Sequence, residues 1–318
     1  MRIFHNTNYD FIKWRWHALI ISIVIIWGGV AAMWLKGGMP LGIDFTGGTV
    51  VIAEFPQPTP EDVVRAALDP ISKDKIVQKY GTTTGKNQIM IRLPLQQGPE
   101  QGASLDAGAA KVEAALNAAN LHPTIIDKQI VGPQIGADLQ SKGIWATLTA
   151  LGGILIYVAF RFRLTFAIGA IVATFHDILI TLVALWVFHY DLSLNVIAAI
   201  LTIAGYSVND TIVVFDRVRE DLRTMRKEPL DVVVNKAVNQ TLGRTVITSG
   251  ATFVAVLALY LFGGEVLRSF AFTMLVGIVT GTYSTVFIAA SIAIILSRRT
   301  TSAGTTPGAA AKARAARA

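Results

Sequence analysis

Six long apolar stretches constrain this chain more than any other feature of its sequence. A helix needs about 20 apolar residues to cross a hydrocarbon core. A backbone in lipid must also satisfy its own hydrogen bonds, which favours helices. We therefore predict a polytopic α-helical membrane protein with six transmembrane helices, at residues 17–35, 143–160, 164–188, 192–215, 245–263 and 269–297.

The distribution of charge indicates an orientation. Outside residues 36–142, every Lys and Arg except Arg268 falls in segments expected on one side, namely 1–16, 161–163, 216–244 and 298–318. Because Lys-rich and Arg-rich segments stay in the cytoplasm, we expect both termini there, in a bacterial inner membrane and among its lipids. The net charge of +7 follows this asymmetry, so we expect no nucleic-acid partner.

Residues 36–142 are long enough to form a folded domain between the first and second helices. Their apolar patterns predict a β-α-β-β-α-β order, with strands at 48–56, 75–80, 88–93 and 123–131 and helices near 60–68 and 104–119. That order is the split unit of ferredoxin-like domains. With the orientation above, we expect an α+β ferredoxin-like periplasmic domain.

The segments at the cytoplasmic side have patterns of their own. Residues 229–240, within the loop 216–244, place apolar residues at helical spacing and predict a short amphipathic helix along the membrane interface. Residues 298–318 are rich in Ala, Gly, Thr and Arg without apolar periodicity, which predicts a disordered cytoplasmic tail. Residues 1–16 are expected to form a cytoplasmic N-terminus on the same side.

Two carboxylates fall inside the predicted helices, Asp177 in the third and Asp210 in the fourth, and we interpret both, together with Arg244, as candidates for proton coupling. An ionisable group in hydrocarbon is costly, so each needs a partner, a water path or a function. A stripe of polar residues shares one face with Asp210 and is suited to carry protons towards it: Asn195, Thr202, Tyr206 and Asn209. Arg244, at the start of the fifth helix, could pair with Asp210.

Structural interpretations of the same residues stay open. Asp210 could be a rigid acid satisfied by its neighbours, and Asp177 could be satisfied locally by His176 and nearby threonines. A further charged group lies where the fourth helix ends, and we interpret it as a solvated cluster: Asp216, Arg217, Arg219 and Glu220.

Six motifs along the chain resemble those of one known family. In order they are Tyr9–Phe11, Gly42–Gly48, Val131–Gly136, His176–Asp177, Ser207–Glu220 and Thr241–Gly250. Together they resemble the SecF family of protein-translocase subunits, within the resistance-nodulation-division superfamily. The resemblance extends over residues 9–297.

That resemblance implies partners and a function. Members of the family join six helices to six from the homologue SecD, and work with the SecYEG channel and the motor protein SecA. The resemblance implies that protons drive the export of unfolded preprotein at the periplasmic side. Asp210 matches the family's membrane aspartate and Arg244 its functional arginine. Seven residues where the domain joins the membrane are expected to be hinge points or tight packing turns: Asp44, Phe45, Thr46, Gly47, Gly48, Gly132 and Gly136.

Two other functions remain open: a proton-coupled exporter of small molecules or lipids, and a scaffold that only stabilises the translocon. The chain contains no cysteine, metal-ligand cluster, nucleophile triad or phosphate-binding loop. We therefore expect neither a cofactor nor a metal, and a hydrolytic enzyme is disfavoured.

Overall fold

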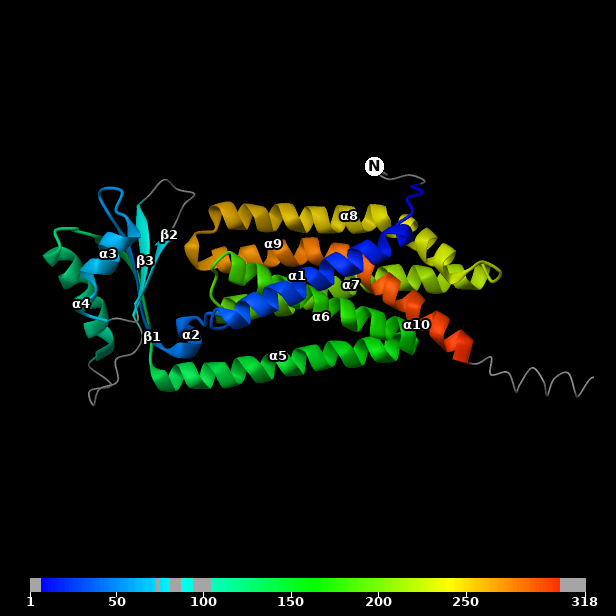
Figure 1. The fold of residues 1–318 in the computed structure, drawn as a ribbon, viewed down its shortest axis with the longest axis horizontal. Coiled ribbons are helices and arrows are strands. Elements are labelled where there is room, and N and C mark those ends of the chain that lie inside the picture. Colours follow the sequence, from blue (N-terminus) through cyan, green and yellow to red (C-terminus); the bar gives the residue numbers. More distant parts are fainter. Residues whose placement is uncertain (1–6, 73–74, 81–86, 94–103, 304–318) are drawn as a thin grey trace, which may run out of the picture.

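The computed structural model describes residues 7–72, 75–80, 87–93 and 104–303. The molecule is elongated, with a bundle of long helices and an α+β domain at one end (Figure 1). We call the end of the bundle next to this domain the domain end, where α6 (Leu164–Val187) finishes. The opposite end, where α7 (Leu194–Thr224) finishes, is the tail end.

Six helices in the described part of the chain are long and apolar enough to cross a membrane, which confirms the predicted class of a multi-pass membrane protein. Besides α6 and α7 these are α1 (Arg15–Leu35), α5 (Pro133–Arg161), α8 (Leu230–Phe262) and the last span. The last span consists of α9 (Glu265–Ser284), the π-helical η2 (Thr285–Ala289) and α10 (Ala290–Ala303). A short 3₁₀ turn, η1 (Ile12–Trp14), precedes α1.

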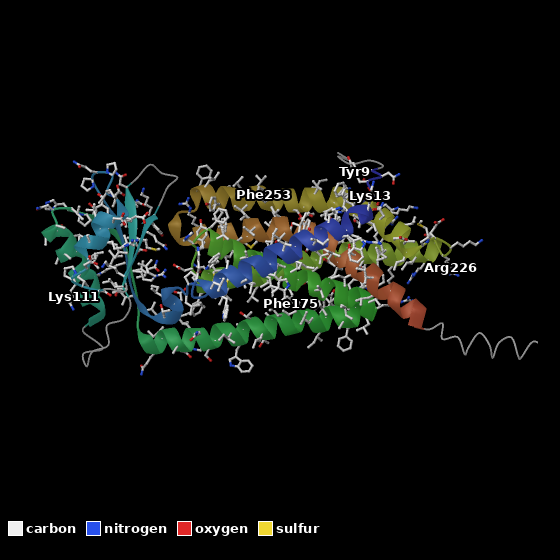
Figure 2. All side chains as sticks on the ribbon, viewed as in Figure 1. Tyr9, Lys13, Lys111, Phe175, Arg226 and Phe253 are labelled. Atoms are coloured by element: carbon white, nitrogen blue, oxygen red, sulfur yellow. The ribbon has the colours of Figure 1, made fainter. Side chains whose placement is uncertain are left out.

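The six spans differ in how much of their surface the protein covers. The last span, α6 and α7 are about half buried, whereas α1, α5 and α8 expose most of their apolar residues. Large side chains such as Trp27, Trp145 and Phe160 point outward, as lipid-facing residues do. Figure 2 shows Lys111 and Arg226 at opposite ends of the molecule, with Phe175 and Phe253 along the bundle between them.

The helix at the tail end corrects one prediction. The separate interfacial helix expected at 229–240 is the first part of α8, which continues without a break to Phe262. Its apolar face packs into the bundle core, where Val234 and Val238 meet Phe215 of α7. The sequence did not predict one continuous helix here, because polar residues between 239 and 245 interrupt the apolar pattern. They do not interrupt the helix itself.

Other helix ends also differ from the expected bounds. The second span begins at Pro133, ahead of the apolar stretch, because Gly132 and Pro133 form a favourable helix start. The expected disordered tail begins at 298, yet α10 is helical to Ala303. Residues 304–318 lie outside the described part.

The domain has the predicted ferredoxin-like order. Its four strands are β1 (Gly48–Glu54), β2 (Ile76–Tyr80), β3 (Gln88–Leu93) and β4 (Thr124–Val131). They pair antiparallel in the order β2-β3-β1-β4. Residues 81–86, between β2 and β3, lie outside the described part of the chain.

Both faces of the central strand β1 are covered, as its nearly continuous β-branched sequence requires. Val51 and Ala53 pack beneath α3 (Glu61–Ala67) and α4 (Ser104–Ala118), where they meet Val64 and Leu116. The alternate residues, Val50 and Ile52, form a smaller cluster with Ile43, Tyr80, Met90 and Val131 on the other face of the sheet. The short α2 (Ile43–Thr46), which the sequence did not predict, supplies Ile43.

Candidate functional site

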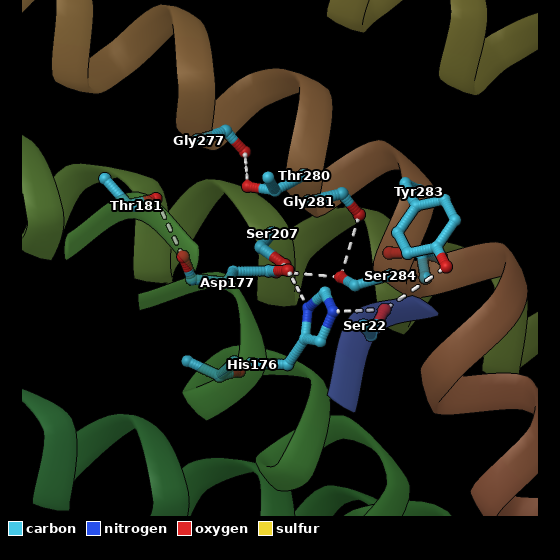
Figure 3. A network of polar contacts seen from close by, with 12 residues as sticks. Ser22, His176, Asp177, Thr181, Ser207, Gly277, Thr280, Gly281, Tyr283 and Ser284 are labelled. Atoms are coloured by element: carbon cyan, nitrogen blue, oxygen red, sulfur yellow. Dashed lines mark hydrogen bonds and ion pairs between the residues drawn. The ribbon is translucent and has the colours of Figure 1, made fainter. Parts of the chain in front are cut away.

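Asp177 is fully buried in the middle of α6 and is bound from three sides (Figure 3). Ser207 of α7 and Ser284 of α9 donate to its Oδ2 at 2.5 and 2.8 Å. The Nδ1 of His176 lies 3.0 Å from Oδ1. Buried carboxylates persist when such donors replace water, so Asp177 joins the three central helices.

The same network reaches the peripheral helix α1. The Nε2 of His176 lies 2.9 Å from the hydroxyl of Ser22, which lies 3.2 Å from that of Tyr283. Tyr283 donates to the carbonyl of Ala18 at 2.9 Å. One chain of polar contacts therefore runs from α1 through α6 to the last span.

Small residues allow α7 and α9 to approach closely enough for this network. A Cβ atom added at Gly277 would lie 2.2 Å from Cδ1 of the buried Ile203. At Gly281 it would lie 3.1 Å from Cβ of Ser207 and 3.6 Å from Oδ2 of Asp177. The G-x-x-x-G spacing thus brings two backbones together, and Ser284 follows one turn later.

Asp210 lies on α7 and faces α8. It is 9% exposed, and its Oδ1 accepts a 2.6 Å hydrogen bond from Thr245. Its Oδ2 is buried and has no hydrogen-bond partner among the described residues. Beside it, the hydroxyls of Thr211 and Thr285 lie 2.9 Å apart. Thr245 therefore holds one oxygen of Asp210, while the other oxygen is buried and the hydroxyl of Thr285 is close enough to act on the carboxyl.

The sequence predicted that Arg244 could pair with Asp210, but the contacts among the described residues do not include an ion pair between them. Arg244 is exposed, and its charge acts on the carboxyl from beyond ion-pair distance. The next residue, Thr245, is buried and faces Asp210 instead. Successive side chains on a helix point about 100° apart, which explains why only one of the two makes contact.

The predicted polar stripe on α7 divides into two parts. The hydroxyl of Tyr206 points into the bundle, where it donates to Ser249 and Thr252 at 3.4 Å. Asn195, Thr202 and Asn209 are exposed on the outer face of the helix. The single chain therefore does not enclose the whole stripe.

Comparison with known proteins decides the family. The family description "Protein export membrane protein SecD/SecF, C-terminal" matches residues 111–299, and "SecD/SecF GG Motif" matches residues 33–58. The SecF subunit of Koribacter versatilis is 37% identical over 92% of this chain and 93% of its own length. That of Escherichia coli O157:H7 is 38% identical over 91% and 88%.

The chain belongs to the SecF family of protein translocase subunits. Among solved structures, it resembles SecDF, a translocon-associated membrane protein from Thermus thermophilus, with 32% identity and a TM-score of 0.81. The match covers 92% of this SecF chain but 39% of the SecDF polypeptide. SecDF in a super-membrane-facing form matches with 32% identity and a TM-score of 0.68, covering 95% and 40%.

In this SecF protein, the motif after α1 forms a tight turn against α5 and α7. Gly47 and Gly48 have φ angles of 69° and 131°, which favour glycine. A Cβ atom at Gly136 would lie 3.1 Å from the backbone nitrogen of Gly47. The remaining motif residues have distinct positions: Phe45 is buried, Thr46 donates to the carbonyls of Gly42 and Gly47, and Gly132 precedes α5.

Asp44, in the same motif, contacts the membrane helix that carries Asp210. Its Oδ2 accepts a 2.9 Å hydrogen bond from the backbone nitrogen of Leu194, the first residue of α7. A carboxylate in this position satisfies a free amide and is favoured by the helix dipole.

The charged residues at the tail end are partly paired rather than simply solvated. Asp216 accepts two hydrogen bonds from Arg161 of α5, at 2.8 and 2.7 Å. Arg217 binds Glu220 at 2.7 Å and Gln240 of α8 at 2.5 Å. Arg219 is exposed.

Sequence reasoning did not identify the hydroxyl residues that bind the two acids. The two threonines expected to satisfy Asp177 bond elsewhere, since Thr174 donates to the carbonyl of Ala170 and Thr181 to that of Asp177 itself. Serines on other helices bind its carboxylate instead. Hydroxyl residues within otherwise apolar spans were the one sequence feature that could have indicated such partners. The described residues contain no group of three His, Cys, Asp or Glu that could hold a metal ion.

Proposed function

We propose that this chain works with SecD in the Sec export machinery and uses the proton-motive force to assist preprotein translocation and release at the periplasmic side. In this proposal the chain lies in the bacterial inner membrane with both termini cytoplasmic, and SecYEG with SecA delivers the preprotein. Asp210 is the residue that exchanges the proton.

The geometry of Asp210 is the observation that carries the proposal. Its Oδ1 is held by Thr245, while Oδ2 is buried without a hydrogen bond among the described residues. A proton can therefore bind at Oδ2 while the bond to Thr245 persists. Asp177 contrasts with it, because Ser207 and Ser284 already donate to its Oδ2. We assign Asp177 to holding the helices in register beside the exchange site.

The outer face of α7 supports a helical partner such as SecD. Exposed residues recur along it at helical spacing, and they are small or polar: Asn195, Ala198, Thr202, Gly205 and Asn209. Polar groups in a membrane-spanning segment need protein or water around them, and small residues allow another helix to pack closely. A second set of helices would enclose the stripe and give protons a route along α7.

The available energy suits a conformational mechanism. One elementary charge crossing 100 mV releases about 2.3 kcal/mol, which corresponds to a shift of roughly fiftyfold in a two-state equilibrium. Our chain matches the two SecDF structures at the same 32% identity but with TM-scores of 0.81 and 0.68. The second of these structures is described as SecDF in a super-membrane-facing form, which supports more than one conformation for SecDF.

The decisive variant is Asp210→Asn, measured in inverted vesicles that contain SecD and the translocon. We expect complex assembly to survive, since Asn keeps an oxygen for Thr245, and proton-driven export to fall about a hundredfold. Asp138→Asn is the matched control, because it makes the same change at an exposed residue of α5 whose partner is Lys142.

The results separate three interpretations of the protein. Unchanged export in Asp210→Asn would favour the scaffold function. Loss of assembly would assign Asp210 to structure alone. Loss of export with intact assembly supports proton exchange at this residue.

A further inference from the structure

The domain and the bundle meet at a junction built around the start of α7. The backbone nitrogen of Gly42 donates to the carbonyl of Leu192 at 2.7 Å, and that of Leu192 donates to the carbonyl of Pro40 at 2.8 Å. A Cβ atom at Gly42 would lie 3.0 Å from the Leu192 carbonyl oxygen, a tight contact that a glycine avoids. The segment entering the domain and the loop before α7 are therefore joined in both directions.

An ion pair adds a connection from the sheet. Arg92 lies on β3, an inner strand, and its guanidinium pairs with the carboxylate of Asp191 in the loop before α7. Arg92 is 8% exposed, and the same guanidinium donates to the carbonyl of Leu41 at 3.4 Å. A pair this well buried holds its geometry, because separating the charges would leave each one poorly solvated.

Asp44 provides a third connection, directly to the helix. It accepts a hydrogen bond from the backbone nitrogen of Leu194, while Ser193 accepts one from that of Val196 at 3.3 Å. The first turn of α7 thus depends on one side chain from its own loop and one from the segment that enters the domain. A movement of α7 along its axis would pull on Asp44.

The helix between this junction and Asp210 is continuous. Asp210 lies on the same α-helix as Leu194, roughly 24 Å away at about 1.5 Å per residue. By contrast, the connection from α1 contains Gly37 and Gly38, with φ angles of 93° and 95° and open space around both. The domain is thus held to the start of α7 by side-chain and backbone contacts. Its link to α1 is a glycine turn closed by a hydrogen bond from the backbone nitrogen of Gly38 to the carbonyl of Met33 at 2.8 Å.

We propose that Asp44 and the Arg92–Asp191 pair are positioning residues that transmit the movement of α7 to the domain. This inference rests on the proposed function, in which Asp210 drives that movement. It gives Asp44, in the motif expected to be a hinge or a tight packing turn, a mechanical role. In this assignment the junction moves as one body, and bending takes place at Gly37 and Gly38.

The first test exchanges the charges of the ion pair. We expect Arg92→Asp and Asp191→Arg each to lower proton-driven export about tenfold, and the double variant to recover most of the loss. Lys79→Ala is the matched control, because Lys79 is an exposed cation on the neighbouring strand β2 and lines the same 610 Å³ cavity between domain and bundle. Its export should stay within about twofold of the parent.

The second test uses Asp44 and does not disturb the sheet. Asp44→Asn keeps an oxygen acceptor for the Leu194 amide and should retain most of the export, whereas Asp44→Ala should lose about fivefold. Equal export in both variants would show that the hydrogen bond to α7 is not what matters.

The third test follows the movement itself. The chain contains no cysteine, so spin labels on Lys111→Cys in α4 and Phe262→Cys at the end of α8 report one distance. In vesicles with SecD, a proton-motive force should change that distance in the parent and in the charge-exchanged double variant. It should leave the distance unchanged in either single variant.

The outcomes separate this inference from the proposed function. If Asp210→Asn abolishes the distance change while Arg92→Asp preserves it, the proton role stands and the junction role is overturned. If Asp210→Asn leaves the distance change intact while Arg92→Asp removes it, the junction transmits movement from another source. If the charge-exchanged double variant recovers neither proton-driven export nor the distance change, the role of the Arg92–Asp191 pair is also overturned.

Discussion

Thr245 donates a 2.6 Å hydrogen bond to Asp210, while Arg244, the residue before it, is exposed and outside ion-pair distance. The carboxyl is therefore oriented by a neutral hydroxyl, and the positive charge nearby is not fixed to it. This arrangement separates two roles that a direct ion pair would combine. The hydroxyl sets position, and the cation is left able to approach or withdraw.

The role of the hydroxyl can be tested with isosteric variants. Thr245→Val keeps the shape and removes the donor, so Asp210 loses its hydrogen bond, which is worth about 1.5–3 kcal/mol when the acceptor is charged. We expect proton-driven export to fall about tenfold. Thr245→Ser restores a donor and should recover most activity. Equal export by the valine variant and the parent would contradict the assignment.

The role of the cation can be tested by changing its shape without its charge. Arg244 acts on Asp210 at a distance, so Arg244→Lys should retain more export than Arg244→Ala, by about fivefold or more. The comparison needs matched expression, checked by immunoblot of the membrane fraction. Equal loss in both variants would mean that the planar guanidinium forms a two-point contact during the cycle.

We expect substitutions at Asp177 to lower the stability of the protein, whereas substitutions at Asp210 lower export. Asp177→Ala strands the hydroxyls of Ser207 and Ser284 in the bundle, and we expect the free energy of unfolding to fall by about 3 kcal/mol. Thermal unfolding in detergent measures this loss. Asp210→Asn, measured alongside, should unfold close to the parent temperature. A variant at Asp177 that is fully stable but inactive would move it into the proton pathway.

The close contact between α7 and α9 makes a prediction about packing. Gly277→Ala would place a methyl group against Ile203, and we expect a loss of about 1–3 kcal/mol. Gly152→Ala is the control, since an added Cβ atom there would meet no heavy atom within 4 Å. Combining Gly277→Ala with Ile203→Ala should recover part of the loss. Equal unfolding temperatures for the two glycine variants would refute this account.

The sequence predicted the number of spans and the order of the domain because both depend on local apolar pattern. It did not reveal that residues 229–240 continue into the fifth span. Polar residues interrupt the apolar pattern there, because some of them face α7 or the N-terminal segment. Asn239, for example, accepts a hydrogen bond from the backbone nitrogen of Tyr9 at 2.9 Å. Contacts between segments so far apart leave no periodic signal.

The candidate site was predicted in part for the same reason. Asp177 and Asp210 stand out because acids are rare in apolar spans. Their partners Ser207, Ser284 and Thr245 do not stand out, since hydroxyl residues often bond to their own helix backbone. Only the packing of the three helices decides which hydroxyl meets which acid.

The π-helical turn in the last span links positions that are distant in the sequence. It begins at Thr285, next to Ser284, so that consecutive residues bond to Asp177 and to Thr211. Its last carbonyl, at Ala289, would lie 2.8 Å from a Cβ atom added at Gly169 of α6. A side chain at position 169 would therefore force α6 or this turn to shift. The two segments restrict the substitutions that each can tolerate.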